Sequence, residues 1–322
     1  MGTLTAIVLG SAAGGGFPQW NCRCPVCLLA WAGDTRVRAR TQASLAVTAD
    51  GESWLLVNAS PDLRQQLQRC KALHPTSGAP EIGHPRERKS DEPDLRRAGT
   101  RGSPIKSVLL TGAEIDQVAG LLTLREREPF TICATAATHA ALADNAIFGA
   151  LAGDVVTRKA VVPGASLTFP GGLEAQLFLV PGKAPLYLEG DNPDTATETA
   201  ANVGVELSAG GARMTYVPGA AAVTAAMMER IARADVVLFD GTLFRDDEMI
   251  TTGAGTKTGR RMGHMPIDGD GGSLAALAGV TGRRIYIHIN NTNPILVDGS
   301  PERAHVERKG WEVAEDGMEI VL

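Results

Sequence analysis

Three short stretches of the chain indicate its fold class: SVLLTGAEID at residues 107–116, DVVLFDG at 235–241 and RRIYIHINN at 283–291. Each contains a run of large apolar residues that is typical of a buried strand, and each run ends in polar residues. The first half of the chain is rich in strands joined by hairpin turns, and the second half repeats strand and helix units. We therefore expect one α/β domain with two mixed sheets covered by helices.

The expected elements follow the same patterns along the rest of the chain. Further strands are predicted at residues 43–48, 53–58, 173–180, 203–207 and 214–217. Helices are predicted from 116 to 125, from 221 to 233 and from 272 to 278, with a further one ending at residue 70. Since neither a linker nor a repeat divides the chain, we treat residues 1–322 as a single domain. Residues from about 75 to 102 are charged and proline-rich, which predicts a flexible, solvated insertion.

Composition excludes several classes of protein. Of the 322 residues, 44% are hydrophobic and 21% are charged, which is the balance of a globular protein with a sizeable core. The 31 basic and 36 acidic residues give a formal charge of -5, which argues against nucleic acid as the main partner. No apolar run is long enough for a transmembrane helix. Residues 1–10 lack the pattern of a secretory signal, so we expect a cytoplasmic protein.

Three of the five cysteines, Cys22, Cys24 and Cys27, lie within six residues in the stretch CRCPVC. Three thiolates on one tight loop are typical of a structural zinc site, which needs a fourth ligand from elsewhere in the chain. A reduced loop without metal is the simplest alternative. A redox CxxC pair is another, but the additional Cys22 and the absence of a helical pattern argue against it. We therefore predict a structural zinc ion.

A second set of residues, Asp116, Asp240, His264 and His288, follows or ends predicted strands or lies in a loop after glycine-rich sequence. Ligand sites in α/β folds collect at the carboxyl ends of strands. Two carboxylates and two imidazoles that meet there suit a divalent metal such as iron or manganese. Glu114, two residues before Asp116, adds a carboxylate on the same face of an extended segment. Taken singly, each of these residues is more typical of a helix cap or a hydrogen-bonded loop residue.

Several strings resemble the protein B family of pyrroloquinoline quinone (PQQ) biosynthesis. They are GSAAGGGFPQWNCRCPVC (10–27), LLVNASPDLR (55–64), MGHMPI (262–267), YIHINNTNPIL (286–296) and GWEVAEDGMEI (310–320). The resemblance covers nearly the whole chain apart from the charged insertion. It implies the metallo-β-lactamase fold, an αββα sandwich of two mixed β-sheets flanked by helices. The chain is also similar to the phosphoribosyl cyclic phosphodiesterase branch of that superfamily, which shares the CxCxxC zinc loop.

The metal motif of the superfamily, HxHxDH, is altered in this chain. It falls on residues 112–117, where Asp116 remains and none of the three histidines does. A further histidine is expected near 216–219 and is also missing, whereas the bridging acid matches Asp240 and the last histidine matches His288. The resemblance therefore implies one metal site built from Asp116, Asp240 and His288, and argues against a dinuclear zinc hydrolase.

The resemblance also implies a reaction, which is the iron- and O₂-dependent hydroxylation of the tyrosine ring in a peptide-derived Glu-Tyr precursor of PQQ. A mixed carboxylate and imidazole set suits non-haem Fe(II). Glu114 and His264 are then the candidate catalytic residues, with His264 as a ligand or proton donor. The alternative is a carrier that binds PQQ or its precursor during transport to the periplasm. Residual phosphodiesterase activity is a weaker alternative, because the histidines are missing.

Substrate contacts are expected from Arg260 and Arg261, which share a loop with His264. Arginine clasps a carboxylate through two parallel hydrogen bonds, and the glycine-rich loop at 251–263 can close over a substrate. If the arginines are not used, the amides at 290–293 are the next candidates. The fourth zinc ligand stays open, because the superfamily histidine there is Asn291 in this chain. Other proteins of the pathway and a second copy of the chain are the partners to consider.

Overall fold

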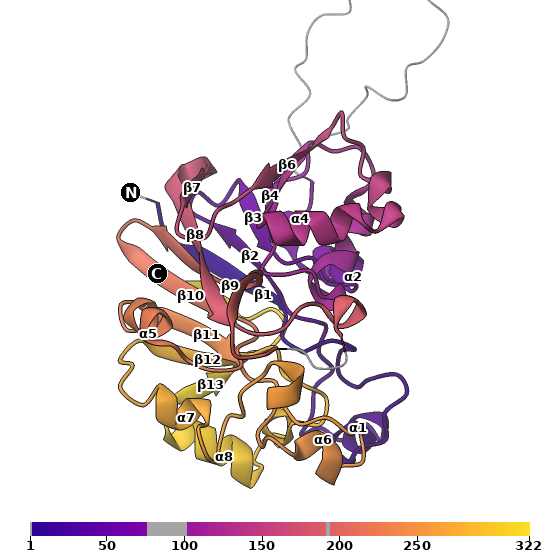
Figure 1. The fold of residues 1–322 in the computed structure, drawn as a ribbon, viewed down its shortest axis with the longest axis vertical. Helices are drawn as coiled ribbons and strands as arrows, with labels where there is room; N and C mark the ends of the chain where they lie inside the picture. The colour runs from indigo at the N-terminus through magenta and orange to yellow at the C-terminus, as the bar shows by residue number, and fades with distance from the viewer. Residues whose placement is uncertain (1, 76–101, 191–193) are drawn as a thin grey trace, which may run out of the picture.

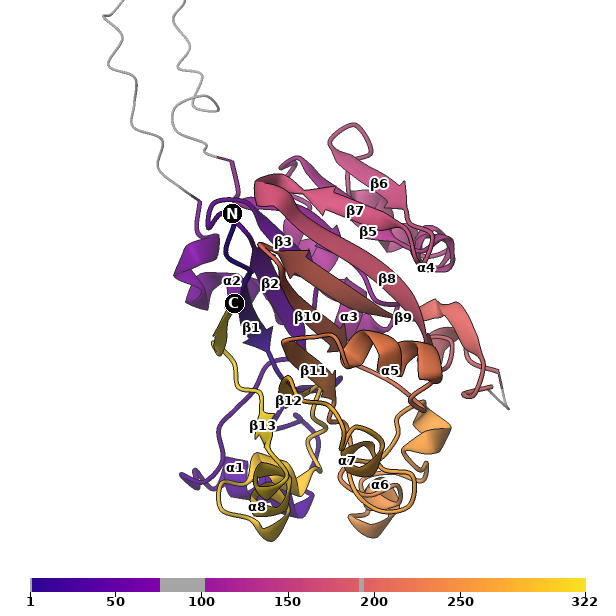
Figure 2. The same ribbon diagram turned by 90° about the vertical axis from the view of Figure 1, so that its left-hand side faces the viewer.

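The structure, a computed structural model, describes residues 2–75, 102–190 and 194–322. The charged insertion predicted at about 75–102 therefore lies almost entirely outside the described residues. Two seven-stranded sheets lie face to face with helices on both outer sides, as Figures 1 and 2 show from two directions. This arrangement confirms the predicted αββα sandwich.

The first sheet contains most of the N-terminal half of the chain, in the order β14-β1-β2-β3-β4-β5-β6. Its strands are β1 (Thr5–Gly10), β2 (Ser44–Thr48), β3 (Trp54–Val57), β4 (Ile105–Leu109), β5 (Phe130–Ala134), β6 (Val156–Ala160) and β14 (Glu319–Val321). Pairings from β14 to β3 are antiparallel, and pairings from β3 to β6 are parallel. The last strand of the chain thus returns to the edge of the first sheet, beside β1.

The second sheet repeats this plan in the order β13-β12-β11-β10-β9-β8-β7. Its strands are β7 (Ser166–Phe169), β8 (Leu173–Pro181), β9 (Glu198–Ala209), β10 (Ala212–Val217), β11 (Val236–Asp240), β12 (Arg283–Ile287) and β13 (Trp311–Val313). Pairings from β7 to β10 are antiparallel, and pairings from β10 to β13 are parallel. Each sheet therefore has one parallel half, and the carboxyl ends of those parallel strands carry the polar residues predicted from the sequence.

Successive residues of the central strands pack into different cores, because side chains alternate across a sheet. In β11, Val236 and Leu238 pack between the two sheets, whereas Val237 and Phe239 pack against the helices on the outer side. A strand buried on both faces reads as a continuous apolar run, which is why VVLF was recognisable in the sequence. Burial on both faces fixes the register of the strand, since a slip of one residue would exchange the two cores.

The helices are short and divide between the two outer faces, as Figure 2 shows. They are α1 (Pro25–Trp31), α2 (Leu63–Arg69), α3 (Ile115–Val118), α4 (Ala136–Ala143), α5 (Ala225–Ile231), α6 (Glu248–Thr251), α7 (Ser273–Ala276) and α8 (Pro301–Arg308). Residues of α2, α3 and α4 share a core with the first sheet, and residues of α1, α5, α7 and α8 share one with the second. The single helix predicted from 116 to 125 is instead α3 followed by a 3₁₀ segment, Ala119–Leu124.

Candidate metal centre

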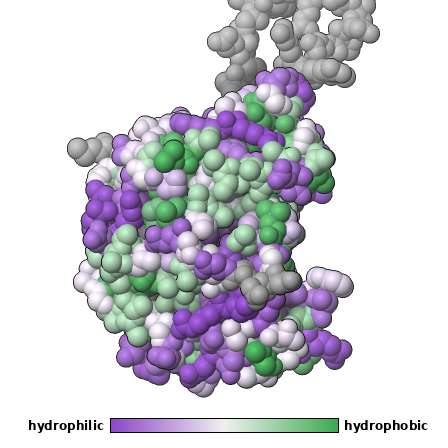
Figure 3. Space-filling model, viewed as in Figure 1, coloured by the Kyte–Doolittle hydropathy of each residue, from purple (hydrophilic) through white to green (hydrophobic). Residues whose placement is uncertain are grey.

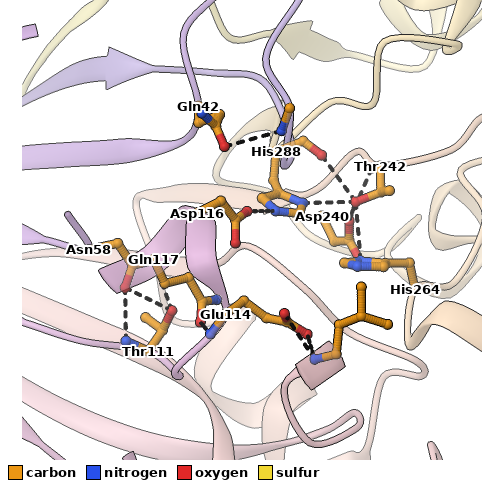
Figure 4. A network of polar contacts seen from close by, with 12 residues as sticks. Gln42, Asn58, Thr111, Glu114, Asp116, Gln117, Asp240, Thr242, His264 and His288 are labelled. Carbon is orange, nitrogen blue, oxygen red and sulfur yellow. Dashed lines mark hydrogen bonds and ion pairs between the residues drawn. The ribbon is translucent and has the colours of Figure 1, made fainter. Parts of the chain in front are cut away.

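Four polar side chains predicted from the sequence lie close together near the carboxyl ends of the parallel strands of both sheets. Asp240 ends β11, and His288 directly follows β12. Asp116 lies in the first turn of α3, after β4, and His264 follows the 3₁₀ turn Arg260–Met262. Figure 4 shows their side chains directed toward one another from both sheets. The structure therefore brings all four together, as predicted.

Asp116 and His288 form a buried pair. The Oδ2 atom of Asp116 lies 2.8 Å from Nε2 of His288. Burial by itself raises the pKa of Asp116, but the hydrogen bond and charge of His288 and the charge of His264 together hold that pKa below its usual range. Burial likewise lowers the pKa of His288, and the hydrogen bond to Asp116 together with the nearby carboxylate charges reverses this effect. Each residue therefore stabilises the charged form of the other.

Asp240 is fully buried and makes four hydrogen bonds. Its Oδ2 atom accepts from the backbone N–H of Ala220 at 2.9 Å and lies 2.8 Å from Nδ1 of His264. Its Oδ1 atom accepts from the backbone N–H and the hydroxyl of Thr242 at 3.0 and 2.6 Å. Burial raises the pKa of Asp240, but the charges of His264 and His288 and the hydrogen bonds from His264 and Thr242 together hold it below its usual range, so the carboxylate is ionised.

Thr242 connects the two acid–imidazole pairs. Its Oγ1 atom lies 2.9 Å from Nδ1 of His288 and 3.1 Å from Nδ1 of His264. The two imidazole rings are stacked, with centroids 5.3 Å apart and an interplanar angle of 21°. A single hydroxyl group thus helps to orient both rings and one of the carboxylates.

The donor atoms of Asp240, His264 and His288 all lie within 4.8 Å of one another, as a shared metal ion requires. Asp116 contacts this group through its hydrogen bond with His288. Two ligands about 2.1 Å from one metal and at a right angle to each other lie about 3 Å apart. The 2.8 Å separation of Asp116 Oδ2 and His288 Nε2 fits such a pair. The three donors that lie within 4.8 Å of one another, two imidazoles and one carboxylate, are a ligand set that suits a divalent metal ion.

His264 lies beside residues 216–219, where the superfamily motif leads one to expect a histidine. A Cβ atom added to Gly219 would lie 3.1 Å from Cε1 of His264, so the ring packs directly over that glycine. The imidazole is therefore supplied by a loop 45 residues further along the chain. Gly112 is another position at which the superfamily motif has a histidine. A Cβ atom added to Gly112 would lie 2.5 Å from Oε1 of Gln117. The amide side chain of Gln117 fills that space.

The backbone of His288 has a φ of 58°, in the left-handed region that disfavours residues with a Cβ atom. Such a conformation costs about 1–3 kcal/mol and is found at functional sites. It turns the chain sharply after β12. The hydrogen bonds of the ring to Asp116 and Thr242 help to offset this cost.

A cavity of about 330 Å³ opens beside these residues, which is a size suited to a small ligand. Asp116, His264 and His288 line it, together with Glu114 as predicted. The rest of the lining is mixed: Lys183, Lys257, Asn202 and Asn290 are polar, and Leu186, Met249 and Met262 are apolar. The two lysines were not predicted from the sequence. Lys257 lies within the glycine-rich loop that was expected to cover the substrate. Its position in that loop could have indicated from the sequence that it lines the cavity.

Glu114 is held at the edge of the cavity by two donors. Its Oε1 atom lies 3.1 Å from Nζ of Lys183, and both carboxylate oxygens lie 3.1 Å from the backbone N–H of Leu186. Lys183 also contacts Glu189 at 3.0 Å. Burial raises the pKa of Glu189, but hydrogen bonds from Arg261 and Lys183 hold it at about 2. Glu114 and Glu189 therefore belong to one network of charges at the edge of the site.

The two arginines predicted to bind substrate are not among the described residues that line this cavity. The guanidinium group of Arg260 donates to the backbone oxygen of Asp270 at 2.7 Å, in a separate surface hollow. Arg261 pairs with Glu189 at 2.5 Å. The prediction placed both side chains correctly in the loop before His264, but nearby acceptors direct them away from the cavity.

Cys22, Cys24 and Cys27 bring their sulfur atoms within 4.8 Å of one another. The expectation that no helix is present here was wrong, because α1 begins at Pro25 and Cys24 caps it by accepting a hydrogen bond from Cys27 N–H. Burial raises the pKa of Cys24 to about 12, so a bound cation is needed to hold its thiolate. The backbone oxygen of Asn291 lies 3.5 Å from the Cys24 sulfur and 3.8 Å from the Cys27 sulfur.

Comparisons with known proteins agree with this architecture. Residues 53–289 match the model of the β-lactamase superfamily domain. Coenzyme PQQ synthesis protein B from Methylorubrum populi is 52% identical over 98% of this chain and 99% of its own length. The chain belongs to the coenzyme PQQ synthesis protein B family. The relative of the same name from Methylobacterium nodulans is 53% identical over 99% of this chain and 100% of its own.

Two solved structures share the fold of this chain. The crystal structure of Zn²⁺-bound PqqB from Methylobacterium extorquens is 51% identical, covers 99% of this chain and 100% of its own, and has a TM-score of 0.90. A diphosphatase of the PhnP family matches at 18% identity, with 99% and 97% coverage and a TM-score of 0.66, which shows the shared fold alone. Among the described residues, no helix is long and apolar enough to cross a membrane.

Proposed function

We propose that this member of the coenzyme PQQ synthesis protein B family is a metal-dependent enzyme of PQQ biosynthesis. Its reaction is the hydroxylation of the tyrosine ring in a Glu-Tyr precursor, with Fe(II) and O₂. The observation that carries the proposal is the buried cluster of two carboxylates and two imidazoles beside a cavity of about 330 Å³. The changed HxHxDH motif removes the ligands of a dinuclear zinc hydrolase, so a different reaction is expected on the same fold.

Asp116, Asp240 and His288 are the proposed iron ligands, and the ring of His264 lies beside the last two. Bound Fe(II) supplies the activation of O₂ that the ring needs. The protein holds these ligands before iron binds, because Ala220 N–H and Thr242 fix Asp240 by hydrogen bonds. Such outer contacts orient ligands and raise their affinity for the metal.

The apolar part of the cavity is where we place the substrate ring. Met249 and Met262 line the cavity, and methionine sulfur makes favourable contacts with aromatic edges. In the overall reaction one oxygen atom of O₂ enters the ring and the other leaves as water. A reductant supplies two electrons, and two protons are consumed.

Two residues are proposed to handle protons. Glu114 Oε2 accepts a hydrogen bond from Leu186 N–H and faces the cavity, so it is assigned as the acceptor of the proton that the ring carbon loses. His264 is the proposed donor of a proton to the oxygen atom that leaves as water. Its ring also lines the cavity, and its Nδ1 atom contacts Asp240. Asp240 orients that ring, in the manner of a carboxylate beside a catalytic imidazole.

The structural zinc ion is proposed to bind Cys22, Cys24 and Cys27, with the backbone oxygen of Asn291 as the fourth ligand. A sulfur at about 2.3 Å and an oxygen at about 2.0 Å from tetrahedral zinc lie about 3.5 Å apart. The distances of 3.5 and 3.8 Å from Asn291 O to two of the sulfurs fit this geometry. Asn291 follows His288 by three residues, so this zinc ion would fix the turn beside the metal ligands.

The test is O₂ consumption by the iron-loaded protein, followed with an oxygen electrode in the presence of a reductant and Glu-Tyr. We expect uptake that depends on both iron and the dipeptide and that is lost in Glu114→Gln. Glu302→Gln, a change at a distant surface acid, should keep the activity. A carrier would instead bind PQQ or its precursor tightly and consume no oxygen, and that result would overturn the proposal.

A further inference from the structure

Three cations surround one carboxylate at the edge of the cavity. Glu189, whose side chain is 4% exposed, contacts Arg261 at 2.5 Å, Lys183 at 3.0 Å and Lys257 at 3.5 Å. Glu114 is the second carboxylate of this network, through Lys183. Among the residues that the structure describes, these three cations therefore contact two carboxylates beside the proposed substrate site.

The three cations are not equally available to a ligand. Lys183 is 10% exposed and lies between two carboxylates, at 3.1 and 3.0 Å. Arg261 makes the shortest contact with Glu189 and does not line the cavity. Lys257 makes the longest contact, is 41% exposed and lines the cavity. Its ammonium group is thus the one that can exchange its partner for a ligand at little cost.

We propose that Lys257 is the anion-binding residue of the cavity and that it takes a carboxylate of the substrate. Lys183 and Arg261 neutralise Glu189, so that this acid does not compete with the substrate for Lys257. A lysine ammonium is a compact charge with three donors on a flexible stem, which suits a ligand that enters and leaves. The inference rests on the proposed function for the identity of the substrate.

The arrangement also explains how a dipeptide can be oriented. Asp116 and His288 line the cavity together with the two methionines, and Lys257 is contributed by the glycine-rich loop. A substrate with an aromatic ring and a carboxylate can reach both groups at once. Binding of its carboxylate to Lys257 would draw the loop at 251–263 onto the ligand. The position of the ring relative to the metal would then depend on this one contact.

The test is calorimetric binding of Glu-Tyr to the iron- and zinc-loaded protein without oxygen, so that turnover plays no part. Gln-Tyr and the C-terminal amide of Glu-Tyr each lack one carboxylate. We expect one of them to bind the wild-type protein at least about ten-fold more weakly than Glu-Tyr, because a charge-assisted hydrogen bond is lost. The ligand that binds more weakly identifies the carboxylate held by Lys257, because it is the one in which that carboxylate is an amide.

Variants of Lys257 complete a double-mutant cycle between this residue and the substrate carboxylate. Lys257→Gln should bind Glu-Tyr at least about ten-fold more weakly and should no longer distinguish the identified amide from Glu-Tyr. Lys257→Arg should retain most of the affinity, and Lys309→Gln, a change at an exposed lysine, should bind as the wild type does. Equal binding of Glu-Tyr by Lys257→Gln, or of all three ligands by the wild type, overturns the anion site and leaves the proposed reaction standing. If the wild type does not bind Glu-Tyr, the proposed substrate is wrong.

Discussion

Asp116 Oδ2 and His288 Nε2 lie 2.8 Å apart, although 172 residues separate them in the chain. One residue follows a strand of the first sheet and the other follows a strand of the second. Their contact therefore joins the two halves of the sandwich at the ends of the parallel strands. The same separation would suit two ligands of one metal ion, which is the role proposed for this pair.

Replacement of Asp240 is expected to abolish iron binding without affecting zinc in the cysteine loop. Changes to outer partners of a metal ligand alone cost about 10–100-fold in metal affinity, and loss of a ligand should cost more. Metal analysis of Asp240→Ala after reconstitution should find zinc at the wild-type level and almost no iron. Asp144→Ala, at an exposed helix end, is the control and should bind both metals. Iron retained by Asp240→Ala would remove Asp240 from the ligand set.

Thr242 is expected to set iron affinity without touching the metal. Thr242→Val keeps the shape of the side chain and removes the hydroxyl that contacts Asp240 and both imidazoles. We expect iron affinity to fall by about 10–100-fold, measured by competition with a chelator. Thr215→Val is a matched control, because Thr215 is also buried but its hydroxyl has no hydrogen-bond partner among the described residues. Equal iron affinity in both variants would show that Thr242 plays no part in holding the ligands.

Glu248 should make the stability of the protein depend on pH. Burial raises the pKa of this carboxyl to about 7, although Thr292 and the Phe244 N–H donate hydrogen bonds to it. The folded chain then holds a proton that the unfolded chain releases between about pH 4.5 and 7. Because the folded state binds more protons in that range, the free energy of unfolding falls as the pH rises, by up to about 3 kcal/mol.

The measurement is urea unfolding of the wild type and Glu248→Gln from pH 4.5 to 8. The difference between their free energies of unfolding should change with pH up to about 7 and then level off. Glu302→Gln, at a less buried acid beside the same surface hollow, should follow the wild type. A difference that does not vary with pH would show that the Glu248 carboxyl titrates normally.

Loss of one zinc ligand should disturb the neighbouring turn as well as the cysteine loop. In Cys27→Ser we expect loss of zinc and a melting temperature lower by several degrees, because structural zinc contributes directly to folding. Iron binding should weaken too, since Asn291 contacts the sulfurs and follows His288 by three residues. Cys70→Ser, at a cysteine outside the cluster, should behave as the wild type. Unchanged zinc content in Cys27→Ser would refute the proposed site.

The fold could be predicted from the sequence because its central strands are buried on both faces. Runs such as VVLF at 236–239 cannot form an exposed edge, and the polar residues that end them mark the edge where ligands bind. The short helix α1 was missed, because its start depends on capping by Cys24 rather than on apolar periodicity. Helices of four to eight residues carry too few turns to show a clear pattern.

The position of the candidate metal centre could be expected from the sequence, whereas the surroundings of the cavity could not. Asp240 ends a strand and His288 directly follows one, which fixes their place, and Asp116 lies in the helix that follows β4. The packing of His264 over Gly219 depends on the path of a loop, and sequence spacing does not determine that path. The directions of the Arg260 and Arg261 side chains could not be predicted for the same reason. Their direction depends on the acceptors that the folded chain brings near them, the backbone oxygen of Asp270 and the carboxylate of Glu189.

The measurement that tests the central claim most directly is anaerobic reconstitution with Fe(II), followed by addition of air and mass spectrometry of the Glu-Tyr dipeptide. The account predicts a product heavier by one or two oxygen atoms, with labelled oxygen taken from ¹⁸O₂ and not from water. Protein reconstituted with zinc alone should give no product. A dipeptide of unchanged mass after exposure of the fully iron-loaded protein to air and a reductant would contradict the account.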